Sequence, residues 1–162
     1  MKKSVKIAIA VIVVLAIIAI ICVAVMTTTG GKKAITIEEF DAKAKELGYI
    51  MSEVQNSTTD EEEITGSKAA IKEDYSYLVI FYTLKDNDAA NSFYNKQKEN
   101  YEKSKQEGTE AVEKSGKNYE TYTLKSDSKY MYVARVDNTV VQLSVNEESE
   151  QEVSAFIQKL GY

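Results

Sequence analysis

The chain has 162 residues and a formal net charge of −5, and it contains no His, no Pro, no Trp and a single Cys, Cys22. This composition excludes zinc and haem sites built on His or Cys, catalytic triads that need either residue, and any disulfide within one chain. The charge is unevenly divided: residues 1–33 carry five Lys and no acid, whereas residues 34–162 carry 15 basic and 25 acidic side chains. So acidic a segment would repel nucleic-acid phosphates, and we expect no nucleic acid among its partners.

The first predicted element is an uncharged apolar run over residues 7–26, composed almost entirely of Ile, Val, Ala and Leu. A helix of this length spans roughly 30 Å, which matches the hydrocarbon core of a bilayer. In lipid the backbone must satisfy its own hydrogen bonds, so a helix is favoured despite the many β-branched residues. We therefore predict a transmembrane helix at residues 7–26, with the lipid bilayer as its partner.

Basic residues beside this run predict how the chain crosses the membrane. Lys2, Lys3 and Lys6 make residues 1–6 a basic tip, which the positive-inside rule places in the cytoplasm. Residues 27–33 (TTTGGKK) then form a short flexible stalk that leads to an extracytoplasmic domain. The alternative is a cleaved signal peptide and a secreted domain, although signal peptides have a shorter apolar core of about 7–15 residues.

The first half of the extracytoplasmic segment is predicted to contain one helix and three strands. Thr36 and Glu39 have capping-box spacing at the start of a helix over residues 36–47, and Gly48 ends it. Residue 75 begins a run that is apolar on both faces, so this strand should be central in a sheet. The predicted strands are residues 49–54, 67–73 and 75–84, with a polar acidic loop at 55–63 and a tight turn around Asp74.

The second half is predicted to contain two more helices and three more strands. Asp86 or Asp88 caps a helix that ends at Gly108, and a loop follows as far as Gly116. The pair Asp137-Asn138 tolerates the positive φ of a hairpin turn. The predicted elements are helices at residues 86–107 and 147–160 and strands at 118–125, 129–136 and 139–145.

This order, α-βββ-α-βββ-α, predicts one α+β domain over residues 34–162 with a mostly antiparallel sheet and helices packed on one face. The order also suggests an internal duplication. The first and last helices both end in Leu-Gly-Tyr, at residues 47–49 and 160–162. The alternative is that two unrelated helices end by the same stop chemistry.

Tyrosines and one arginine are the candidate ligand contacts. Tyr75 and Tyr77 share a face of one predicted strand and Tyr130 and Tyr132 a face of another, and aromatic rows on an open sheet face can stack on sugars or grip a peptide. Arg135, the single Arg, could clamp a carboxylate. The alternatives are that the tyrosines fill the layer between sheet and helices, and that Arg135 pairs with a nearby acid.

Metal and catalytic chemistry have little support in the sequence. The acidic runs at residues 60–63 and 86–88 lack the spaced oxygens and the turn-making Gly of a calcium loop, so no metal or cofactor is predicted. A Ser nucleophile would need Lys or a carboxylate as its base, and no Ser-x-x-Lys pair stands in a convincing setting. We therefore expect a protein that is not an enzyme.

The N-terminal layout carries one resemblance. Two Lys, an apolar twenty-residue run and TTTGGKK, followed by ITIEEFDAKAKELGY, resemble uncharacterised membrane-anchored surface proteins of low-GC Gram-positive bacteria, without the lipid-attachment signal of their lipoprotein members. The resemblance implies an anchor and a small Tyr- and Lys-rich domain, and it transfers no functional residues. The expected function is a membrane-tethered extracytoplasmic binding module for a protein, peptide or envelope polymer. The alternatives are a small cell-envelope hydrolase using carboxylates or Ser-Lys, and a structural or regulatory partner of another membrane protein.

Overall fold

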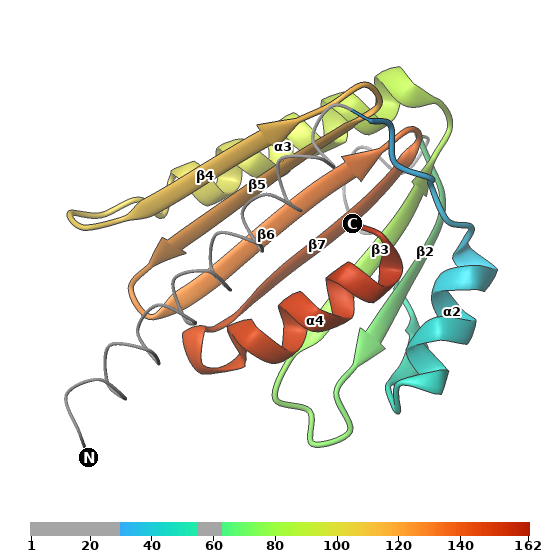
Figure 1. Cartoon of the computed structure of the whole chain (residues 1–162), viewed down its shortest axis with the longest axis horizontal. Helices are drawn as coiled ribbons and strands as arrows, with labels where there is room; N and C mark the ends of the chain where they lie inside the picture. Colours follow the sequence, from blue (N-terminus) through green and yellow to red (C-terminus); the bar gives the residue numbers. More distant parts are fainter. Residues whose placement is uncertain (1–29, 55–62) are drawn as a thin grey trace, which may run out of the picture.

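The computed structural model describes residues 30–54 and 63–162 (Figure 1). The predicted transmembrane helix, the cytoplasmic tip, the first three of the seven stalk residues and nearly all of the acidic loop lie outside these residues. No helix within the described ranges is both long enough and apolar enough to cross a bilayer.

The described residues form an α+β domain with three α-helices and a seven-stranded sheet, which confirms the predicted fold class. The capping box at Thr36 is also present, with the Thr36 side chain accepting from the Glu39 amide and the Glu39 carboxylate accepting from the Thr36 amide. The elements in chain order are α2 (Ile37–Glu46), β1 (Ile50–Glu53), β2 (Ile64–Ile71), β3 (Leu78–Leu84), α3 (Asn87–Glu102), β4 (Glu110–Ser115), β5 (Tyr119–Ser126), β6 (Lys129–Val136), β7 (Thr139–Asn146), a 3₁₀ turn (Glu147–Ser149) and α4 (Glu150–Leu160).

The sheet joins two meanders and is antiparallel throughout. Its strand order is β1-β2-β3-β7-β6-β5-β4, so the last strand of each meander pairs with the other, with Phe81 opposite Val141. The strand that is apolar on both faces, β3, lies in the interior of the sheet as predicted. Strands β1 and β4 form the two edges, and the open edge of β4 borders the candidate site.

The helices cover both faces of the sheet, and the prediction that they pack on one face was wrong. Figure 1 shows α2 and α4 on one side, which we call the front face, and α3 on the other, the back face. Successive residues of β3 alternate between two separate cores, with Phe81 in front and Tyr82 behind. A central strand that is apolar on both faces needs a cover on each side, and α3 supplies the second one.

A strand also forms where the sequence indicated a loop. Residues 110–115 (EAVEKS) form β4, which pairs with β5 along its whole length. All six residues are exposed, so the hydrophobic alternation that would mark a buried strand is missing. The second meander therefore has four strands where three were predicted, and its extra strand widens the front face beyond α4.

The shared Leu-Gly-Tyr sequences form the same helix stop. Gly48 and Gly161 have φ of +82° and +94°, which favours glycine, and the amide of the following tyrosine donates to a carbonyl five residues earlier. This turn places Tyr49 and Tyr162 in the front core, on the side of their helices that faces the sheet. The glycine C-cap shared by the two helices thus explains why both end in Leu-Gly-Tyr, and an internal duplication stays a prediction.

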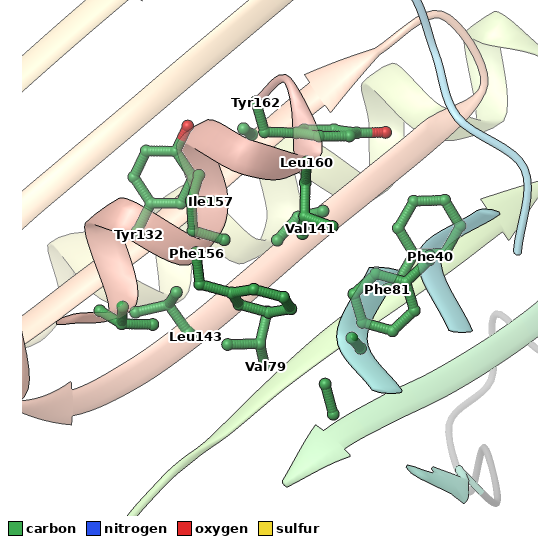
Figure 2. Packing of buried hydrophobic residues seen from close by; sticks show 14 of the residues in the cluster. Phe40, Val79, Phe81, Tyr132, Val141, Leu143, Phe156, Ile157, Leu160 and Tyr162 are labelled. Atoms are coloured by element: carbon green, nitrogen blue, oxygen red, sulfur yellow. The ribbon is translucent and has the colours of Figure 1, made fainter. Parts of the chain in front are cut away.

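An aromatic cluster forms the centre of the front core (Figure 2). Phe40 of α2 stacks on Phe81 of β3 with ring centroids 4.9 Å apart, and Tyr162 meets Phe81 edge-on at 6.3 Å. Phe156 of α4 stacks on Tyr49 at 4.3 Å. These contacts fix α2 and α4 over β3, so the strands farther along the sheet lie outside their cover.

Candidate functional site

A groove of about 390 Å³ opens on the front face, between α4 and the outer strands β4 and β5. Its floor is the sheet, its wall is the side of α4 that carries Ser154, Ile157 and Gln158, and Lys32 lies on its lining. The groove exists because α4 packs on the central strands while the four-stranded meander extends past it. It is thus a direct consequence of β4, the strand that the sequence pattern did not predict.

Strand β5 provides a polar row along the floor. Alternate residues of a strand point to the same face, and the residues that line the groove are Tyr119, Thr121, Thr123 and Lys125. The register places Lys114 of β4 beside Thr121, and Tyr132 of β6 on the other side of Thr123. The floor thus combines hydroxyl and ammonium groups with the faces of tyrosine rings.

Tyr130 and Tyr132 share the front face, as predicted, but they are only 7% and 8% exposed, so they also pack in the layer between sheet and helix. The Tyr130 hydroxyl accepts a hydrogen bond from Ser154 Oγ at 3.3 Å. The Tyr132 hydroxyl has no hydrogen-bond partner within the described ranges, and Figure 2 shows the Tyr132 ring beside Ile157 of α4. Burial raises the pKa of Tyr132, so its hydroxyl stays protonated and is able to donate.

Tyr75 and Tyr77 do not share a strand face, and that prediction was wrong. Strand β3 begins only at Leu78, because the Asp74 carboxylate accepts from the amide and the hydroxyl of Ser76 and stabilises a turn. Tyr75 is 73% exposed in this turn, whereas Tyr77 is buried with its hydroxyl 2.8 Å from that of Tyr49. The turn is not part of the groove lining.

Arg135 follows the alternative interpretation, in which it pairs with a nearby acid. Its Nε donates to the Glu120 carboxylate at 3.1 Å and its Nη1 to the Asp137 carbonyl at 3.2 Å. Arg135 alternates with the front-facing Tyr132 and Ala134 along β6, so it projects to the back face. It therefore contributes nothing to the groove.

A pair of hydrogen bonds fixes Lys32 at the groove. The Lys32 amide donates to Asn118 Oδ1 at 2.8 Å, and Asn118 Nδ2 donates back to the Lys32 carbonyl at 2.8 Å. Asn118 directly precedes β5, so the chain before α2 is tied to the start of that strand. The Lys32 ammonium then lies 5.0 Å from the ring centroid of Tyr119.

The charges along the groove are unevenly balanced. Lys125 pairs with Glu150 at 2.7 Å, and this hydrogen bond raises the pKa of Lys125. Lys32 and Lys114 have no ion-pair partner within the described ranges. Burial, together with the charge of Lys114, lowers the pKa of Lys32. One end of the groove thus holds two ammonium groups that lack a counter-charge.

The groove brings Ser154 and Lys125 to the same lining, as the Ser-Lys hydrolase alternative would require. Such a mechanism also needs a neutral Lys within reach of the Ser hydroxyl. Lys125 instead donates to Glu150, and Ser154 donates to the Tyr130 hydroxyl. Across the described ranges there is also no cluster of three or more acidic or Cys side chains that could hold a metal ion.

Sequence reasoning identified Tyr130 and Tyr132 but missed Lys32, Lys114 and Tyr119. Lys114 was assigned to a loop and Lys32 to a stalk, and neither segment carries a periodic pattern that shows which way its side chains point. The alternation of Tyr119, Thr121 and Thr123 was the available signal, since it marks a polar strand face beside the tyrosines of β6. Comparisons with protein-family models, curated proteins and solved structures found no match.

Proposed function

We propose that this protein is a membrane-tethered, extracytoplasmic binding module that captures its ligand, without chemical change, in the groove between α4 and strands β4 and β5. Residues 7–26 hold it in the bilayer, and residues 1–6 remain in the cytoplasm. The observation that carries the proposal is the Tyr132 hydroxyl, in a side chain only 8% exposed, which has no partner in the described part of the chain and opens onto the groove.

Four other buried tyrosines of the front core have hydrogen-bonded hydroxyls, as expected of tyrosines that only fill the layer between sheet and helices. Tyr49 and Tyr77 satisfy each other, Tyr130 pairs with Ser154, and Tyr162 pairs with Thr139. The Tyr132 hydroxyl is not among the fully buried polar atoms that lack a partner within the described ranges, and its side chain lines the groove, so a ligand can reach it. Tyr132 instead keeps a hydroxyl at a concave surface with no partner among the described residues. This supports the proposal that a ligand supplies the missing hydrogen-bond partner.

Hydrogen exchange on the full-length protein tests the proposal. In native membranes the groove is occupied, so amides of β4 should exchange more slowly than in detergent-purified protein. The opposite edge strand, β1, provides the internal reference because it lies far from the groove in the sheet order. Thr123→Trp, which fills the floor, should abolish the difference, whereas Thr65→Trp on an exposed part of β2 should preserve it.

Equal exchange of β4 in the two environments, with folding of the purified protein confirmed by circular dichroism, would contradict a groove ligand. Slower exchange of β4 that persists in Thr123→Trp would place any ligand elsewhere. The structural or regulatory alternative predicts the first of these results, because a partner held by the transmembrane helix needs no groove.

A further inference from the structure

We infer that the Lys32 end of the groove binds the phosphate of an anionic membrane-lipid headgroup. This inference rests on the proposed function, because it uses the membrane tether and the same groove. It is carried by three observations: the short distance along the chain from the membrane, the two ammonium groups without a counter-charge, and the excess of hydrogen-bond donors.

The tether limits how far the groove can lie from the bilayer. The predicted span ends at Met26, and six residues of extended chain to Lys32 reach at most about 20 Å. Lys32 cannot drift away from the domain, since Asn118 makes two hydrogen bonds to its backbone at the start of β5. The Lys32 end is therefore the part of the groove held nearest to the headgroups.

The charge at this end fits a phosphate. Lys32 and Lys114 are close enough for the charge of one to lower the pKa of the other, and neither has an ion-pair partner within the described ranges. A lysine ammonium binds phosphate as a point charge, and two neighbouring ammonium groups can share one phosphate. The single arginine of the chain faces the other side of the sheet and already pairs with Glu120.

The hydrogen-bonding groups of the groove favour a lipid headgroup over a peptide. Beside the two ammonium groups lie the hydroxyls of Thr121, Tyr119 and Tyr132, and none of these hydroxyls donates to another group of the described chain. A peptide brings amide donors and carbonyl acceptors in equal numbers. A phosphodiester headgroup brings acceptor oxygens in excess, which complements a site with donors in excess.

The test uses the full-length protein in two sets of nanodiscs, one of phosphatidylcholine alone and one also containing phosphatidylglycerol. The rate at which each lysine reacts with an amine-acetylating reagent is read by mass spectrometry. Phosphatidylglycerol should slow the reaction of Lys32 and Lys114 by about fivefold each, from the usual strength of a lysine at an anionic surface. Exposed Lys85 and Lys159 should react equally in both.

Two variants show whether the lysines act as one site. Lys114→Gln should remove the protection of Lys32 by phosphatidylglycerol, whereas Lys45→Gln, on the exposed side of α2, should leave it intact. If phosphatidylglycerol still protects Lys32 in the Lys114→Gln variant, the protection reflects general attraction of lysines to a charged surface. That result would overturn the proposed phosphate site.

Inorganic phosphate added to the phosphatidylcholine discs separates the two sources of the ligand. Protection of Lys32 by phosphate as strong as that by phosphatidylglycerol would assign the site to a soluble anion and overturn the lipid inference. Equal reactivity of Lys32 and Lys114 in both sets of discs would also overturn it. If β4 is nevertheless protected from exchange in native membranes, the binding module stands with another ligand; if that protection is absent too, both proposals fall.

Discussion

Phe81→Ala is expected to lower the free energy of unfolding by about 3–5 kcal/mol, the usual cost of removing a buried phenyl ring. Phe81 has no exposed surface and lies at the meeting point of α2, β3 and the C-terminal turn, stacked on Phe40 at 4.9 Å and against Tyr162 at 6.3 Å. Since small domains have a total stability of about 5–15 kcal/mol, this one cavity removes a large share of it. Urea unfolding followed by circular dichroism measures the change.

Val112→Ala provides the matched control for this prediction. Val112 also loses an apolar side chain in a strand, but it is 52% exposed on the edge strand, so we expect a change within about 0.5 kcal/mol. Equal effects of the two substitutions would mean that the aromatic cluster does not hold the helices on the front face.

Stability is expected to fall steeply above about pH 10. Burial is the main cause that raises the pKa of Tyr77, Tyr94, Tyr132 and Tyr162 above the ordinary value of 10.0. The folded state therefore keeps protons that the unfolded state loses, so stability is full below pH 10 and is lost as the pH rises. Each such group contributes a slope of up to about 1.4 kcal/mol per pH unit. Urea midpoints at several pH values, compared with tyrosinate absorbance, measure it.

Two Tyr→Phe variants distinguish burial from a general effect of alkali. Tyr94→Phe removes one buried hydroxyl that has no partner within the described ranges, so it should cost no stability at pH 7. It should also reduce the slope of stability against pH above pH 10 by the contribution of one proton. Tyr75→Phe, at a side chain that is 73% exposed, should leave the slope unchanged. A stability that stays constant from pH 9 to pH 11 would show that the buried tyrosines ionise freely, against their close packing in the two cores.

Local patterns in the sequence predicted the ends of helices and the tight turns between strands. The capping box at Thr36, the helix stops at Gly48 and Gly161 and the hairpin at Asp137 form as expected, because each depends on residues close in the chain. Strand β4 was missed because it is held by pairing with β5 and by the ion pair between Lys98 of α3 and Glu113, and none of its side chains is buried. The position of α3 on the back face was not predicted, because an apolar stripe shows that a helix packs against a sheet but not which face of the sheet it covers.

The candidate site could be predicted only in part, because local patterns do not show which distant segments of the chain meet. Tyr130 and Tyr132 were found because alternation within one strand fixes a shared face. The two unpaired ammonium groups come from segments 82 residues apart in the chain, and only the sheet register and the Asn118 hydrogen bonds bring Lys32 and Lys114 to one groove. Tyr75 lies outside the strand and the groove because the Asp74 side chain accepts a hydrogen bond from the Ser76 amide and stabilises a turn there.

The central claim, a domain held outside the cell by its N-terminal segment, is tested most directly by labelling one new cysteine in intact cells. The variant Cys22→Ser/Glu107→Cys carries its single thiol on an exposed loop after α3. A membrane-impermeant maleimide should label it fully before the cells are permeabilised, and the labelled protein should sediment with the membranes after washing in high salt. Labelling only after permeabilisation, or release of the labelled protein into the medium, would contradict the account.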